Sequence, residues 1–272
     1  MAADSTVECA RLRTTNHKAI MDVETFVRSR ASTWRKPTID PKSFESLKMK
    51  TPISAAQYLE FSEKDLRLGG KRGLVNALTN AKRAIDCQVA CFLGALGLNS
   101  AGTFPSKVAS LLSLGVVAPR ILNKIVRLRN MLEHEFQLPK KAEVEDAVDV
   151  ATLFLEALKP YTSGGAYMSS GWLADENSAN AWPIRKQGGL TYWRHSDTPK
   201  FTFSNGIYID SNLRARTIAL ELVDGNQLLA RHVMTSANHR FLHLQRFLLK
   251  CRPENQHIHS ARGARELIAI LK

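Results

Sequence analysis

Residues 71–96, KRGLVNALTNAKRAIDCQVACFLGAL, carry the pattern that decides the fold of this chain. Apolar side chains recur there three or four positions apart, which places them along one stripe of an α-helix: Leu74, Leu78, Ala81, Ile85, Phe92 and Leu96. A single apolar stripe is buried only when another element packs against it. The segment therefore predicts a long helix inside a helical bundle.

Further helices are predicted on both sides of this one. Ser54 is a suitable N-cap for a preceding helix that ends at Gly69-Gly70. Helical spacing continues after it over residues 105–114, 119–136 and 142–158, and Pro160 is expected to close the last helix. Residues 34–42, which contain two prolines, are interpreted as a connector.

Beyond Thr162 the pattern changes to short aromatic and β-branched runs separated by turns. Asp224-Gly225 between two such runs indicates a β-hairpin, and helices are expected at 236–250 and 261–271. We predict a mixed fold, α plus α/β, with an N-terminal all-α bundle followed by a smaller α+β domain. The predicted units are a basic, partly helical N-terminal extension, a helical domain and a C-terminal α+β domain, at residues 1–52, 53–162 and 163–272.

Composition and charge narrow the class of protein. Hydrophobic residues make up 44% and charged residues 23% of the 272 residues, a balance typical of globular domains. No apolar run reaches the roughly 18 residues of a membrane helix, and the N-terminus lacks a secretory pattern, so a cytoplasmic protein is expected. The four cysteines have irregular spacing and do not predict disulfides; Cys87 and Cys91 are expected to be small buried side chains on one helix face.

The formal net charge of +13 is divided almost equally, with +7 in residues 1–160 and +6 in residues 161–272. Such a positive potential over a folded surface attracts polyanions. Nucleic acid is therefore the expected partner.

Residues 126–136, VRLRNMLEHEF, combine three side chains that suit RNA cleavage without a metal. His134 can transfer protons near neutral pH, and Arg129 can stabilise the extra charge on the phosphorane. Asn130 can orient the ribose hydroxyl or the imidazole. Attack by the 2′-hydroxyl would give a 2′,3′-cyclic phosphate and a 5′-hydroxyl, a reaction that DNA cannot undergo.

This segment resembles the HEPN superfamily, whose catalytic members share an arginine, a polar residue that is often asparagine, three further residues and a histidine. Here these positions are Arg129, Asn130 and His134, and Phe136 matches the aromatic residue that often follows the histidine. The resemblance covers about residues 53–160, with 80–86 in the first core helix. It implies a HEPN-like bundle and an endoribonuclease that needs no metal or other cofactor. It also implies Asp86 and Glu133 as accessory residues.

Family members of this kind often act as toxins or antiviral defence effectors that cut tRNA or other cellular RNA. A cognate antitoxin or regulator is then a further partner. On a straight helix Arg129 and His134 lie about 140° apart, so one straight helix does not aim both at one phosphate. Either the helix ends or bends before His134, which Pro139 would allow, or a second copy supplies the missing group. Family members form composite sites across a homodimer, so the resemblance implies a symmetric homodimer.

Several alternatives stay open at this point. Arg129 and Glu133 are also spaced as a surface ion pair, with His134 a solvated residue near a helix end. A non-catalytic HEPN-type scaffold that binds RNA or nucleotide is the main alternative function, and a DNA-binding regulator is another. His239 with His243, and His257 with His259, lack a third ligand in the sequence, so no metal site is predicted.

Aromatic residues of the second domain are interleaved with cations, a pattern of base-stacking surfaces. The candidates for RNA binding are Arg127, Tyr192, Trp193 and Arg194. The same pattern, extended to Phe201, Phe203, Tyr208, Lys200, Arg214 and Arg216, also fits a sheet core with a solvated charged face.

Overall fold

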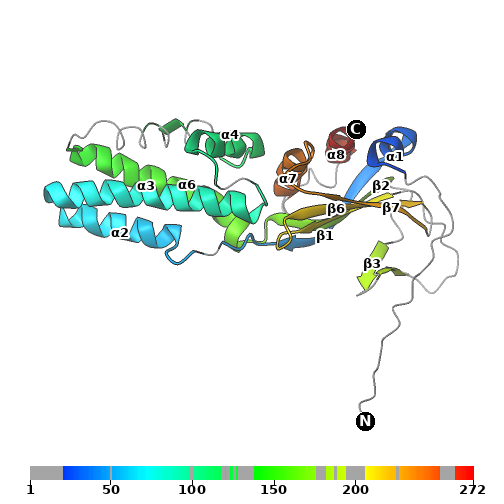
Figure 1. Ribbon diagram of the computed structural model, residues 1–272, viewed down its shortest axis with the longest axis horizontal. Helices are drawn as coiled ribbons and strands as arrows, with labels where there is room; N and C mark the ends of the chain where they lie inside the picture. The colour runs from blue at the N-terminus through cyan, green and yellow to red at the C-terminus, as the bar shows by residue number, and fades with distance from the viewer. Residues whose placement is uncertain are drawn as a thin grey trace, which may run out of the picture.

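The chain forms a mixed helix and sheet fold with two regions arranged end to end, a helical bundle and a sheet covered by helices (Figure 1). The computed structural model describes residues 21–49, 51–98, 101–117, 120, 123–124, 127, 138–175, 182–186, 189–193, 206–224, 227–251 and 261–272. The mixed class predicted from the sequence is confirmed. Both regions contribute to one continuous apolar core.

The helices of the bundle with described bounds are α2 (Ala55–Leu68), α3 (Gly70–Ala95), α4 (Phe104–Leu114) and α6 (Lys141–Ser163). The predicted long helix is α3, and its stripe packs on α2 and α6. Ser54 caps α2, because its hydroxyl accepts from the Gln57 backbone N–H while the Gln57 side chain accepts from the Ser54 N–H. Phe92 and Phe154 are fully buried between these helices.

The prediction that Pro160 ends the last bundle helix is wrong. Helix α6 continues to Ser163 with Pro160 inside it. A proline removes one backbone donor, but the buried side chains of Leu158 and Tyr161 hold the final turn against the core.

The sheet has five antiparallel strands in the order β1-β2-β5-β6-β7. Their bounds are β1 (Pro37–Glu45), β2 (Tyr167–Asp175), β5 (Gly206–Asn212), β6 (Thr217–Asp224) and β7 (Gln227–Met234). Asp224 pairs with Gln227, which confirms the predicted hairpin. A separate two-stranded sheet is formed by β3 (Trp182–Lys186) and β4 (Gly189–Trp193).

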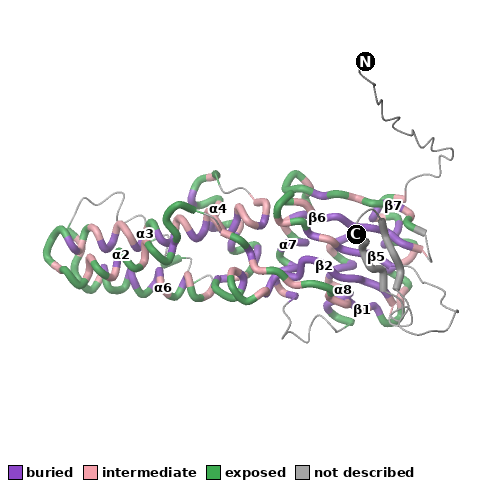
Figure 2. Tube along the Cα trace, turned by 90° about the horizontal axis from the view of Figure 1, so that it is seen from below, coloured by how far each residue is buried: buried purple, intermediate pink, exposed green. Residues whose placement is uncertain are grey.

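Helices α1 (Val23–Ser29), α7 (Phe241–Lys250) and α8 (Ala261–Leu271) cover one face of the five-stranded sheet (Figure 1). Alternate side chains of the strands join the main core from that face: Ile39, Leu173, Ile207, Ile209, Leu220 and Leu222. On the opposite face, Trp172, Ala174, Tyr208 and Val223 form a second buried cluster. Successive residues of β2 and β6 are buried without alternation, and the central strands appear as buried stretches in Figure 2.

The predicted connector at residues 34–42 is wrong, because Pro37–Glu45 forms strand β1. Ile39 pairs with Leu173, and the register shifts between Pro41 and Ser43. Prolines are compatible with the start of an edge strand and with a bulge, since those positions need no ladder N–H. The sheet region therefore includes residues from the predicted N-terminal extension, and the bundle is inserted between β1 and β2.

The two regions are tied together where the chain passes between them. The Leu47 N–H donates to the Tyr161 carbonyl at 2.7 Å. Deeper inside, the Tyr167 hydroxyl donates to Gln245 Oε1 at 2.8 Å and lies 2.6 Å from Ser211 Oγ. Gln245 Nε2 in turn donates to the Leu96 carbonyl at the end of α3, at 2.8 Å. This buried network connects the bundle, the sheet and α7.

Candidate functional site

The predicted catalytic residues Arg129, Asn130 and His134, with Glu133, lie outside the residues that the structure describes. Arg194 lies outside them as well. Tyr192 and Trp193 belong to β4, where they pair with Pro183 and Trp182, and only their backbone is described. These assignments remain predictions from the sequence.

The segment that leads to the motif exposes a row of cations. Residues 120, 123, 124 and 127 are helical and exposed to solvent. At 100° per residue, Arg120, Lys124 and Arg127 fall within about 60° of one another on the helix surface. Sequence analysis had singled out only Arg127, although the spacing of four and three residues was a readable signal for the other two.

Asp86, the predicted accessory residue, is partly buried on α3 and takes part in an interaction with another group. The same helix carries Asn80, whose Nδ2 donates to Asp65 Oδ2 on α2 at 2.9 Å. The polar residues of the predicted first core helix therefore contribute at least in part to helix packing.

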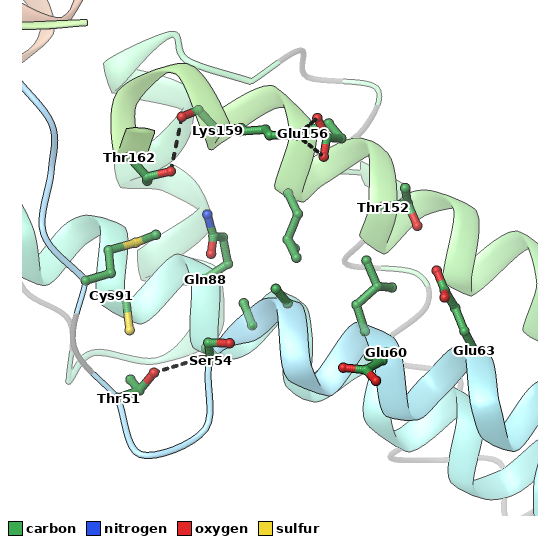
Figure 3. Close-up of a pocket in the computed structure, with 16 residues that line it drawn as sticks. Thr51, Ser54, Glu60, Glu63, Gln88, Cys91, Thr152, Glu156, Lys159 and Thr162 are labelled. Carbon is green, nitrogen blue, oxygen red and sulfur yellow. Dashed lines mark hydrogen bonds and ion pairs between the residues drawn. The ribbon is translucent and has the colours of Figure 1, made fainter. Parts of the chain in front are cut away.

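A cavity of about 460 Å³ opens between α2, α3 and α6 (Figure 3). Its charged lining is mainly acidic, with Glu60, Glu63 and Glu156 against Lys159, and Lys159 Nζ lies 3.1 Å from Glu156 Oε1. A phosphate chain would be repelled by this lining. The cavity is therefore a poor match for an RNA strand.

Two cysteines line the same cavity from α3. Cys87 Sγ lies 3.8 Å from Thr51 Oγ1 and 3.7 Å from the Ile53 carbonyl oxygen. Burial, together with the neighbouring Cys87, raises the pKa of the Cys91 thiol to about 11. Cys91 is thus a protonated thiol at neutral pH, which is the unreactive form.

Two further predictions concern the sheet region. Tyr208 is buried, with its ring centroid 6.1 Å from that of Trp172, so this aromatic belongs to the core and not to an exposed stacking surface. The predicted helix at 236–250 begins only at Phe241, so His239 precedes α7 while His243 lies on it. Both histidines are exposed. The expectation that they lie on one helix, four residues apart, is wrong.

Comparison of the chain with models of protein families, with curated proteins and with solved structures found no match. Among the residues that the structure describes, no helix combines the length and apolar character that crossing a membrane requires.

Proposed function

We propose that the chain is a metal-independent endoribonuclease with a HEPN-like helical domain, acting on RNA in the cytoplasm. The observation that carries the proposal is the sequence Arg129-Asn130-Met131-Leu132-Glu133-His134, which follows a helical stretch with an exposed cationic face. His134 transfers protons, Arg129 stabilises the phosphorane charge, and Asn130 orients the reacting group.

The electrostatics of the described surface support this assignment. Arg120, Lys124 and Arg127 present positive charge on the stretch that precedes the motif. In the sequence, His134 follows Arg127 by seven residues, so these cations and the imidazole belong to neighbouring parts of the chain. We expect a strand bound by its phosphates to these cations to be held close to the motif.

A homodimer with a composite site is part of the proposal. Of the nine large apolar side chains that are exposed among the described residues, seven lie between residues 53 and 153, on or beside the bundle. Single exposed apolar side chains are normal on a monomer surface, so the dimer rests on the separation of about 140° between Arg129 and His134 expected on a straight helix. A scattering mass that corresponds to a monomer at micromolar concentration would contradict the composite site.

Incubation of the purified chain with single-stranded RNA in EDTA tests the proposed activity. We expect cleavage, 5′-hydroxyl ends that accept phosphate from a kinase without prior phosphatase treatment, and no cleavage of DNA of the same sequence. His134→Ala and Arg129→Ala should each lower the rate by about 10²–10⁴-fold. His243→Ala is the matched control, because His243 is an exposed histidine on α7 and should leave the rate unchanged.

The alternative function is a non-catalytic scaffold of the same fold that binds RNA or a nucleotide and regulates a partner. The exposed cations on the pre-motif helix are compatible with this function too. Intact RNA after incubation with a well-folded protein that binds it would favour the scaffold. Tighter binding to duplex DNA than to RNA across a salt titration would instead favour a DNA-binding regulator.

A toxin or antiviral role, with tRNA as a target and a cognate antitoxin or regulator as a partner, is a further part of the proposal. Poor growth of cells that express the wild-type chain, relieved by His134→Ala but not by His243→Ala, is the expected result.

A further inference from the structure

The turn between β5 and β6 forms a groove of about 400 Å³ with the end of α3 and the linker from β1. Three cations line it, Lys48 on the linker and Arg214 and Arg216 on the turn, and all three are exposed. No acidic side chain of the described part of the chain is among its lining residues. The groove is therefore a local concentration of positive charge.

The opposite wall is made by small residues of α3, namely Ala90, Gly94 and Ala95. Short side chains there leave room for a ligand between helix and turn. None of the ion pairs found among the described residues involves Lys48, Arg214 or Arg216. Their charges are consequently available to an anion from outside.

The turn has an unusual backbone conformation at one of these cations. Arg216 has φ +56°, the left-handed region, and is the one residue other than glycine with positive φ in the described part of the chain. Such a conformation disfavours arginine and suits glycine or asparagine. The turn also sits tightly on α3, since a Cβ added to Gly97 would lie 2.7 Å from Arg216 Cβ. Strained residues of this kind concentrate at functional positions.

A neighbouring cavity of about 1040 Å³ shares Lys48 and Arg214 with the groove. Its lining also includes Glu45 and Asp210, so its charges balance. An anionic ligand is thus expected in the groove beside α3 and not in the larger cavity.

We propose that the Lys48–Arg214–Arg216 groove, whose lining residues are all different from those of the predicted catalytic segment, binds the phosphodiester backbone of an RNA strand. This inference rests on the proposed function for the identity of the polyanion. Lysine and arginine are the usual ligands of phosphate oxygens, and arginine binds two oxygens of one phosphate. The groove would hold part of the strand while the motif segment acts on another part.

A simpler explanation for the cations is electrostatic compensation of the C-terminal end of α3, where unpaired carbonyls give partial negative charge. One of the terminal carbonyls, that of Leu96, already accepts a hydrogen bond from Gln245. The two explanations differ in whether removing the charges affects RNA binding or only stability.

The test uses the full chain with His134→Ala, so that RNA stays intact during binding. Lys48→Gln, Arg214→Gln and Arg216→Asn are combined in one variant, with asparagine chosen because it tolerates the left-handed backbone. The matched control combines Arg35→Gln, Arg262→Gln and Arg265→Gln, three exposed cations of the sheet region that remove the same charge. Anisotropy of a labelled single-stranded RNA of about twenty nucleotides is followed across a KCl titration.

The slope of log affinity against log salt should decrease in magnitude by about 0.7 for each phosphate that a variant no longer binds. The groove variant, which lacks three cations, should therefore show a decrease of about 2. The control variant should show less than half of that decrease. Equal decreases in the two variants would overturn the proposal. So would an unchanged slope with a lowered melting temperature, the result expected if the cations only compensate α3. If the wild-type chain binds RNA through the groove but does not cut it, the proposed nuclease activity is wrong while the proposed RNA-binding groove is supported.

Discussion

The sheet region and the helical bundle bury their apolar residues to different degrees. Strands β2 and β6 are buried on both faces, between helices on one side and the Trp172 cluster on the other. The bundle exposes large apolar side chains, among them Leu68 at 81% and Leu153 at 59% of their surface. Figure 2 shows mostly buried residues along the central strands and exposed residues along the bundle helices. The central strands are thus shielded from solvent on both faces, whereas each bundle helix has one face in solvent.

The largest expected effect concerns the core that both regions share. Phe154→Ala on α6 removes a fully buried side chain and should lower the free energy of unfolding by about 3–5 kcal/mol. Leu153→Ala, at the exposed neighbouring position, should cost less than about 0.5 kcal/mol. Urea denaturation followed by circular dichroism measures both. Because the core is continuous, one unfolding transition is expected for the whole chain. Two separate transitions, one for the bundle and one for the sheet, would contradict this expectation.

Thiol labelling compares the two regions directly. Burial raises the pKa of Cys251 in the sheet region to about 12, while that of Cys91 in the bundle is raised to about 11, against an ordinary value of 9.0. At pH 8 both side chains should therefore be thiolate far less often than a free thiol, and Cys251, which is buried while Cys91 is half-buried, should be the less reactive. Alkylation mapped by mass spectrometry should therefore be faster at Cys91 and should increase with pH at both sites. Faster labelling at Cys251 would reverse the assigned order of protection.

The connection between the regions should respond to Tyr167→Phe. This change deletes the hydroxyl that bonds to Ser211 and Gln245 and leaves their polar atoms buried. The expected loss is about 1–3 kcal/mol in the free energy of unfolding. Tyr58→Phe, on the partly buried face of α2, serves as the control and should change stability little. A neutral Tyr167→Phe would mean that water replaces the hydroxyl.

The smallest effect is expected at the start of α1. Asp22 caps this helix, and hydrogen bonds from the Thr25 backbone and hydroxyl hold the pKa of its carboxyl below the ordinary 3.8. A depressed pKa contributes stability above the unfolded value that is lost as pH falls through the folded value. Melting temperatures at pH 5 and pH 3 should converge more in Asp22→Asn than in wild type. An identical pH response in the two proteins would argue against the cap.

Regular patterns were predictable because they depend on neighbours in the chain. The stripe of α3 and the turn residues Asp224-Gly225 identify a helix and a hairpin directly. Strand β2 was not recognisable, because Ser169 and Ser170 interrupt its apolar residues. Both serines are buried and bond to Ser43 of β1 at 2.7 Å, so their burial depends on a distant strand.

The two candidate sites also differ in how far they can be predicted from the sequence. The motif at residues 129–134 is local and can be read from the sequence alone. The groove cannot, because Lys48 and Arg214 are brought together only by the order of strands in the sheet. The sequence indicates Arg214 and Arg216 as charges interleaved with aromatic residues, but no sequence pattern distinguishes Lys48 from other surface lysines.

The insertion of the bundle between β1 and β2 has a consequence for synthesis on the ribosome. Ile39 must wait for Leu173, about 130 residues further along the chain, before the edge strand can pair. At roughly 5–20 residues per second this interval lasts from several seconds to nearly half a minute. All the bundle helices are translated within it. The nascent chain therefore has time to assemble its helices while β1 is still an unpaired strand, and Pro37 and Pro41 within it disfavour pairing with other chains.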